Sequence, residues 1–465
     1  MRGTVMVSSY LVYVSSVVMF LRQYKQVQRG AATSSYIAMV AMLLQPSTIL
    51  IDNGHFQYNT VMLGFVIAAL SSIFAGRLLW SCVFFVAALG YKQMALYYAP
   101  IFFANLLGSS LTPKYRVGRL LAIATVTALS FSLLFLPLIA GTAYDVHRDV
   151  PQPQTSATSP LLSYLPNGLL SNHTVHQILL QFSQVISRMF PFSRGLFEDK
   201  VANFWCALNT VYKVRKLEQL ISLPRLSLYA TLMAMLPSFL LTCADPRAAL
   251  LPYALAASAW SFFLFSFQVH EKSVLLPLMP MTLLLGSSEG LRKECRAWVG
   301  WANLAGAWTL YPLLSRDNLR TPYFIFTLLW AYLLGLPPTS SNVYAKTQDT
   351  RQQDEESRAG RCRHRFQDHV STSTTILHGS FYFAMILWHI GEAFVKPPAD
   401  KPDLWTVLNA CLGAVIFSIC YLWCSWKLIL ESGILNDYFN YRGNETQKAK
   451  TQRIHARRAK KTLKE

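Results

Sequence analysis

The chain has 465 residues, of which 53% are hydrophobic and 14% charged, and its formal net charge is +19. Soluble domains usually carry about 25% charged residues, so this composition indicates a membrane protein. The basic residues lie in short loops between apolar segments and near the C-terminus. This distribution argues against nucleic acid as a partner.

Apolar segments recur along most of the chain. In order they cover residues 4–21, 36–51, 61–74, 79–90, 96–107, 120–140, 226–241, 250–267, 275–285, 297–314, 322–336, 376–390 and 404–429. Several are shorter than the ~20 residues that span the hydrocarbon alone, so we expect some to be tilted, re-entrant or extended by their flanks. The pattern predicts an all-α polytopic membrane protein with about ten to thirteen transmembrane helices.

Breaks between these segments divide the chain into six predicted regions. They are an N-terminal transmembrane module with a lumenal Asp52 hairpin (1–140), a long polar and amphipathic loop region (141–225), a second transmembrane module (226–340), a charged disordered loop (341–375), C-terminal transmembrane helices (376–432) and a basic cytosolic tail (433–465). The tail suits a position on anionic membrane lipid. We see no internal repeat.

The basic loops also predict the orientation. Arg22, Lys25 and Arg29 form a short loop after the first segment. Such loops stay cytosolic under the positive-inside rule. One crossing later, residues 52–59 therefore lie on the opposite, lumenal side.

Asp52 is the only acidic residue before Asp145. A carboxylate in mid-membrane costs roughly 2.5 to 3.5 kcal/mol on insertion scales, so its default interpretation is a functional site at a helix end or in a polar cavity. His55, Gln57 and Tyr58 follow it and add an imidazole, a carboxamide and a phenol. The alternative is an ordinary solvated loop.

Three further polar clusters stand at ends of apolar segments. The candidate binding residues of these clusters are, in chain order, Lys92; Arg194, Glu198, Asp199, Lys200 and Trp205; and His270, Glu271 and Lys272. Carboxylates and amides bond pairs of hydroxyls, aromatic rings cover a sugar face, and a cation neutralises phosphate. The clusters therefore suit a sugar held at the membrane surface.

Each cluster also has a structural interpretation. Lys92 would extend its ammonium to the interface. Residues 198–200 would begin a solvated helix, and residues 270–272 would be a charged cap between spans. A transporter is a further class, but Lys92 alone is thin support for it, and paired broken helices are not seen.

Five strings carry a resemblance to a known family. They are residues 52–59, 92–100, 190–205, 269–273 and 310–317. The chain resembles the endoplasmic-reticulum, dolichol-dependent α-1,3-glucosyltransferases of N-glycan precursor assembly. It is more similar to the members that add the first glucose to the Man9GlcNAc2 lipid-linked oligosaccharide than to those that add the second. The resemblance covers most of residues 1–340 and continues more loosely to about residue 435.

The resemblance implies a GT-C-type bundle in the endoplasmic reticulum membrane. It implies inverting, metal-independent transfer from dolichyl-phosphate glucose to a mannose of the dolichyl-pyrophosphate oligosaccharide, with no cofactor and with membrane lipids as partners. Asp52 and His55 then have supporting catalytic roles. The substrate-binding candidates are Gln57, Tyr58, Lys92, Arg194, Glu198, Asp199, Lys200, Trp205, His270, Glu271 and Lys272. Protein partners are not indicated.

One departure from the family pattern concerns the start of the chain. Met1 resembles a point near the family's second membrane helix, so we expect a fragment, an alternative-start product or an incomplete gene model. The family's first lumenal loop, with its presumed catalytic acid, would then be missing. Asp52 matches the second lumenal acid, a substrate-orienting residue. The alternative function is a catalytically inactive membrane protein that keeps the lipid-sugar groove.

Overall fold

The computed structural model describes residues 2–27, 35–112, 116–150, 172–189, 200–214, 222–287, 290, 292–336 and 370–434, and these residues form helices without a strand. Six helical stretches in this part are long and apolar enough to cross a membrane. They are Gly3–Tyr24, Gln93–Leu111, Val117–His147, Leu223–Ala244, Ala248–Phe265 and Leu404–Ser432. The predicted all-α polytopic membrane fold is confirmed, whereas the predicted number of crossings stays a prediction.

Every predicted apolar segment coincides with helix. The elements are α1 (Arg2–Ser8), η1 (Ser9–Val14), α2 (Ser15–Val27), α3 (Ser35–Leu43), α4 (Pro46–Ile49), η2 (Leu50–Gly54), α5 (Asn59–Phe74), α6 (Leu78–Tyr91), η3 (Gln93–Tyr98), α7 (Ala99–Leu111), α8 (Val117–His147), α10 (His173–Met189), α11 (Phe204–Val211), α12 (Leu223–Ala244), η6 (Ala248–Leu250), α13 (Leu251–Phe265), η7 (Glu271–Val274), α14 (Leu275–Leu283), η8 (Leu284–Gly286), α15 (Lys293–Thr309), α16 (Tyr311–Arg316), α17 (Arg320–Leu334), α19 (Thr372–Phe394) and α20 (Leu404–Ser432). Helices suit lipid because they satisfy their own backbone polar groups.

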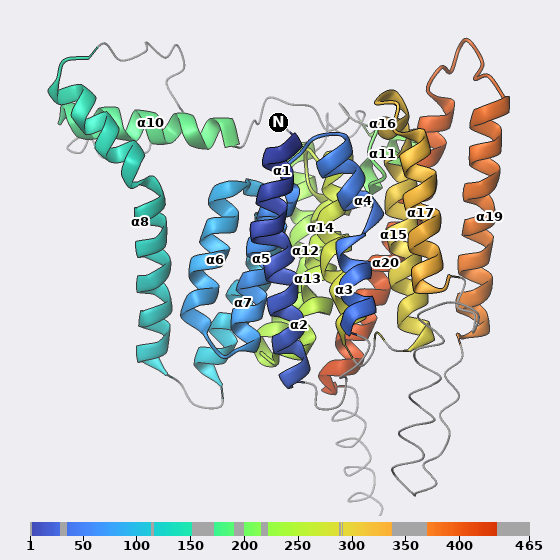
Figure 1. Cartoon of the computed structure of the whole chain (residues 1–465). Helices are drawn as coiled ribbons and strands as arrows, with labels where there is room; N and C mark the ends of the chain where they lie inside the picture. The colour runs from blue at the N-terminus through green and yellow to red at the C-terminus, as the bar shows by residue number, and fades with distance from the viewer. Residues whose placement is uncertain are drawn as a thin grey trace, which may run out of the picture.

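The long helices stand side by side as a bundle (Figure 1). The end that carries η2, uppermost in Figure 1, is called the Asp52 end below. There α10 runs crosswise to the long helices on the side of α8, and α8 stands at one edge, where it packs against α6 and α10. Because α11 has only eight residues, it is too short to cross the hydrocarbon.

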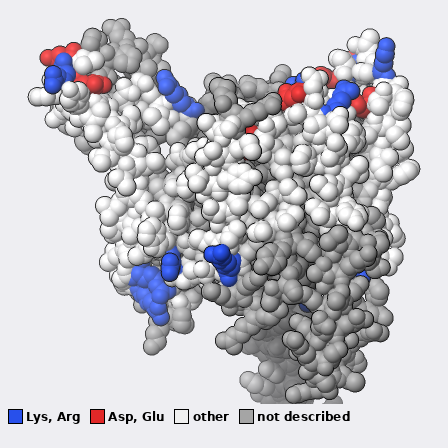
Figure 2. Space-filling view, viewed as in Figure 1, with Lys and Arg blue, Asp and Glu red and all other residues white. Residues whose placement is uncertain are grey.

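Charged side chains mark the two ends of the bundle. Figure 2 shows Lys and Arg at both ends of the visible face, Asp and Glu only near the Asp52 end, and a middle band almost without charge. A hydrocarbon slab demands such a band, since charges at its centre are costly. The membrane therefore crosses the long helices, with the Asp52 end at one surface.

Two predicted regions lie mainly outside the described residues. The charged loop predicted for residues 341–375 is described only from residue 370, and the basic tail predicted for residues 433–465 only to residue 434. The other predicted region boundaries stay predictions.

Buried polar side chains join helices in the interior of the bundle by hydrogen bonds. Asn303 on α15 is fully buried. Its Oδ1 accepts a hydrogen bond from Gln45 Nε2 at 2.6 Å, and its Nδ2 donates to Thr282 Oγ1 at 3.0 Å. This network joins α15, α14 and the link between α3 and α4, so it fixes the helix that leads to Asp52.

We expect Asn303→Leu to lower the free energy of unfolding by about 1 to 2 kcal/mol, because Gln45 is left buried without its acceptor. Thermal unfolding of the purified protein in detergent measures this. The double variant Gln45→Leu/Asn303→Leu is the control and should recover part of the loss, since both polar partners are then gone. Equal stability of the single variant and the wild type would contradict the role of the network.

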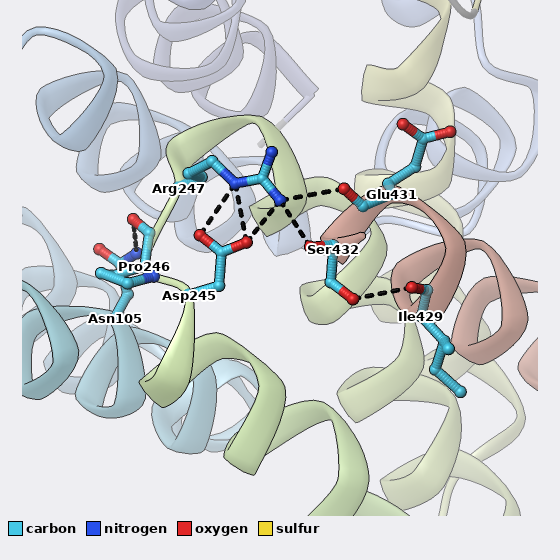
Figure 3. Close-up of polar contacts among 7 residues, drawn as sticks. All are labelled: Asn105, Asp245, Pro246, Arg247, Ile429, Glu431 and Ser432. Carbon is cyan, nitrogen blue, oxygen red and sulfur yellow. Dashed lines mark hydrogen bonds and ion pairs between the residues drawn. The ribbon is translucent and has the colours of Figure 1, made fainter. Parts of the chain in front are cut away.

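At the end of the bundle opposite the Asp52 end, Arg247 joins two helix ends (Figure 3). Its Nε donates to Asp245 Oδ1 at 2.9 Å, and its Nη2 donates to the carbonyl oxygens of Glu431 and Ser432 at 3.0 and 3.1 Å. The last carbonyls of a helix lack partners within it, and they attract cations. Arg247 therefore ties the turn after α12 to the C-terminus of α20.

Candidate functional site

Asp52 lies in η2 and is completely buried. One carboxylate oxygen accepts from Asn59 Nδ2 at 2.8 Å, and the other from the backbone N–H of Thr60 at 2.5 Å. Both donors belong to the first turn of α5, where backbone N–H groups lack helical acceptors and favour a negative charge. The alternative of a solvated loop does not fit Asp52, whose carboxylate fixes the angle between η2 and α5.

Lys92 occupies the extended break between α6 and η3. Its Nζ donates to Asn59 Oδ1 at 2.5 Å and lies 3.5 Å from Gln57 Oε1. Asn59 therefore connects the Asp52 carboxylate to the Lys92 ammonium. The ammonium ends in hydrogen bonds to the hairpin, so Lys92 does more than extend toward the interface.

Burial lowers the pKa of Lys92, and the nearby Lys272 charge lowers it further, whereas the Asp52 carboxylate acts in the opposite direction. Two of the four predicted clusters thus lie within electrostatic reach of one another. A partly desolvated ammonium is well suited to bind a phosphate, since an anion restores the stabilisation that burial removes.

The hairpin also contacts the turn between α16 and α17. His55 Nδ1 pairs with Asp317, and a Cβ on Gly54 would lie only 2.9 Å from Leu319 Cδ1. Beside this pair, Arg316 Nη2 lies 3.5 Å from Glu271 Oε1. Residues 52–59, 270–272 and 316–317 therefore gather at the Asp52 end, although they are far apart in the sequence. The same end holds the exposed imidazole of His270.

Three loops of this end contain strained backbone. Phe56, Gln268 and Asn318 have φ values of 71°, 60° and 59°. A left-handed conformation is unfavourable for residues with side chains and persists where surrounding contacts impose it. The loops that meet here are thus held in specific shapes.

The remaining predicted site residues make other contacts or are not described. Tyr58 OH is 2.7 Å from Thr4 Oγ1 on α1. Lys200 pairs with Asp403 before α20. Trp205 is 3% exposed and donates its indole N–H to the Phe265 carbonyl at 2.7 Å, so its ring packs in the protein. Arg194, Glu198 and Asp199 are outside the described residues. The substrate-binding roles of these residues stay predictions.

The site contains residues that the sequence interpretation did not choose. Asn59, Thr60 and Asp317 complete the contacts of Asp52 and His55. Asn59 and Asp317 lie within strings that carry the family resemblance. Their place in these strings is the sequence feature that could have identified them as site residues. Across the described residues, no group of three or more His, Cys, Asp or Glu is placed to hold a metal ion.

The His55–Asp317 pair is expected to show a coupling free energy of about 0.5 to 1 kcal/mol, because its side chains are 19% and 33% exposed. A double-mutant cycle with His55→Gln and Asp317→Asn, measured by thermal unfolding, tests this. The Lys200–Asp403 pair, at 40% and 62% exposed, is the control and should show coupling near zero. Equal coupling for the two pairs would contradict a structural role for His55.

A helical membrane bundle that gathers carboxylates, amides and cations at one end has the architecture of an enzyme working at the membrane surface. Comparison with known proteins defines that class further. The model of the ALG6, ALG8 glycosyltransferase family matches residues 1–152 and 169–426. The chain belongs to this family of membrane glycosyltransferases, which confirms the resemblance predicted from the sequence.

Several relatives support the assignment. The chain is 37% identical to the dolichyl pyrophosphate Man9GlcNAc2 alpha-1,3-glucosyltransferase of Saccharomyces cerevisiae over 92% of this chain and 72% of the relative. It is 35% identical to a probable enzyme of the same description from Schizosaccharomyces pombe, over 94% and 73%. The Gallus gallus relative is 31% identical over 91% and 76%.

Proposed function

We propose that this chain transfers glucose from dolichyl-phosphate glucose to a terminal mannose of the dolichyl-pyrophosphate-linked N-glycan precursor and forms an α-1,3 linkage. The observation that carries the proposal is the Asp52–Asn59–Lys92 hydrogen-bond chain at one membrane surface. It occurs in a protein 37% identical to a yeast relative named a dolichyl pyrophosphate Man9GlcNAc2 alpha-1,3-glucosyltransferase. No metal or cofactor is part of the proposal.

The donor phosphate is held by cations of the Asp52 end. Lys92 and Lys272 lie within electrostatic reach of one another. Two lysines near one another repel, so an anion between them relieves the repulsion and gains charge-assisted hydrogen bonds. The same contacts stabilise the charge that grows on the phosphate as it leaves.

The reaction is a single in-line displacement. The 3-hydroxyl oxygen of the mannose bonds to C1 of the β-glucose while the bond from C1 to the phosphate oxygen breaks. Dolichyl phosphate leaves with the electron pair, and the hydroxyl proton passes to a general base, a transfer that typically contributes about 10²- to 10⁴-fold. Attack opposite the leaving group inverts β to α.

Asp52 is a positioning residue in this scheme. Both of its oxygens already accept hydrogen bonds from Asn59 and Thr60, so the carboxylate holds the hairpin and, through Asn59, the Lys92 ammonium. His55 has a similar role through Asp317. Fixing reacting groups in one geometry is itself a large catalytic contribution.

The proposed location is the endoplasmic reticulum membrane, with the Asp52 end in the lumen. Arg22 follows the first apolar segment and Arg77 lies between α5 and α6, both away from the Asp52 end. Basic loops favour the cytosolic side. The substrate oligosaccharide would then meet the site from the lumen.

The test is glucose transfer by the purified full chain in nanodiscs, with radiolabelled dolichyl-phosphate glucose and lipid-linked Man9GlcNAc2. The expected product is one glucose heavier and loses that glucose to an α-1,3-specific glucosidase. Donor binding without transfer would favour the alternative of an inactive protein that keeps the groove. If the protein shows no donor binding and no transfer, the proposal is overturned.

A further inference from the structure

A cavity of about 750 Å³ lies where α6, α7 and α8 meet. Residues 76–80, from the turn before α6 and its first turn, line it together with Ser109 of α7 and Arg119 and Ala122 of α8. The helices α6 and α8 begin here and α7 ends here, at the end of the bundle opposite the Asp52 end (Figure 1). The cavity is therefore separate from the candidate site and lies at the other membrane surface.

Two arginines line this cavity, and no Asp or Glu is among its described lining residues. Arg119 is half-buried, and its Nη1 donates to the Ser109 carbonyl at 2.7 Å, which fixes the side chain. Arg77 is exposed, and its guanidinium has no partner in the described part of the chain. Asp245, at the same end of the bundle, already pairs with Arg247. Because the two cations in the cavity repel each other, an anion between them is favoured.

Exposed apolar surface adjoins these arginines. Trp80 is 56% exposed and Leu79 is 41% exposed, and aromatic rings of this kind are typical of the membrane interface. A smaller cavity of about 270 Å³ shares Arg77 and Trp80 with the first and continues to Met19 and Phe84. Positive charge and apolar surface thus lie together at one membrane surface. An amphiphile contacts both of them, whereas a free anion uses only the charge.

We propose that this cavity binds the phosphate of an anionic phospholipid in the leaflet opposite the Asp52 end. The phosphate oxygens accept hydrogen bonds from the Arg77 guanidinium and from the N–H groups of Arg119 that do not bond Ser109. One acyl chain lies along Trp80 and Phe84 in the smaller cavity. Phosphatidylcholine is disfavoured, because its ammonium group would come close to two guanidinium groups. Binding of the anionic lipid does not depend on the proposed transfer of glucose.

Diffuse attraction is the alternative to a defined lipid site. Basic residues gather at the cytosolic surface under the positive-inside rule, and anionic lipids are attracted to any such surface. A matched control therefore changes the same number of charges outside the cavity. Arg22 and Arg116 are exposed at the same end of the bundle and line neither cavity. Diffuse attraction treats the two pairs of arginines alike, whereas a defined site does not.

Native mass spectrometry of the full chain, delipidated in detergent and titrated with phosphatidylinositol, tests the proposal. We expect one phosphatidylinositol to bind about tenfold or more tightly than phosphatidylcholine. Arg77→Gln/Arg119→Gln should lower this affinity about tenfold or more, whereas Arg22→Gln/Arg116→Gln should bind like the wild type. Equal affinities of the two double variants would mean diffuse attraction and would overturn the proposal. Equal binding of both lipids by the wild type would overturn it as well.

Two further measurements test the cavity and the source of the phosphate. Ala122→Phe keeps both arginines but fills the cavity from a half-buried position on α8, so binding of phosphatidylinositol should fall. Phosphatidylinositol should raise the melting temperature of the wild type, and millimolar inorganic phosphate should not. The melting curve of each variant without lipid shows whether it is folded. Unchanged binding by Ala122→Phe, or an equal rise with inorganic phosphate, would overturn the assignment of a lipid to this cavity.

Discussion

Asp52→Asn is expected to lower the rate of glucose transfer about 100-fold, because the geometry of the hairpin depends on the Asp52 carboxylate. The amide keeps the size of the side chain but can present only one acceptor oxygen. It therefore loses either the bond from Asn59 Nδ2 or the bond from the Thr60 backbone. The change also removes the negative charge at the start of α5. The measurement is kcat/KM for transfer by the protein in nanodiscs.

The control is the same substitution, aspartate to asparagine, at a position away from the site. Asp149 is exposed after the end of α8, so Asp149→Asn should transfer glucose at the wild-type rate. Binding of dolichyl-phosphate glucose to Asp52→Asn is measured as well. Retained binding shows that the variant is folded and that the lost activity comes from positioning. Full activity of Asp52→Asn would contradict the positioning role.

The fold was largely predictable because lipid restricts the choice of structure. Residues 120–140 and 404–429 were predicted as spans, and they form α8 and α20. The exact bounds of some helices were harder to predict. The apolar segment 96–107 is too short to span the hydrocarbon alone, but η3 and α7 together form a helical stretch from Gln93 to Leu111. The extension depends on polar residues at its start that a hydropathy pattern discounts.

The site was predictable as separate clusters but not as one arrangement. Asp52 stood out because it is an isolated acid, and its complete burial agrees with a structured position. The pairing of His55 with Asp317 depends on how α16 meets the hairpin, which no local pattern encodes. Trp205 shows the converse, since an aromatic residue in a polar string packs into the protein. Side-chain direction is set by tertiary packing.

Lys92→Met is the second change with a large expected effect. It removes the donor to Asn59 Oδ1 and Gln57 Oε1 and the charge offered to the donor phosphate. A hydrogen bond involving a charged group contributes about 1.5 to 3 kcal/mol, so kcat/KM should fall about 10- to 100-fold. Lys401→Met is the control, because Lys401 is exposed in the turn before α20 and should be dispensable. Equal rates for both variants would contradict a role for Lys92.

The pH dependence distinguishes the charge of Lys92 from its packing. Burial lowers the pKa of the Lys92 ammonium, so its proton is lost at a lower pH than from an exposed lysine. If the ammonium is the active form, transfer is full below this lowered pKa and falls as the pH rises through it. Lys92→Arg keeps the charge to much higher pH and should move the alkaline fall upward, even if its maximal rate is lower. An alkaline fall at the same pH in both proteins would mean that another group titrates. The roles of Asp52 and Asn59 would then have to be explained without the Lys92 charge.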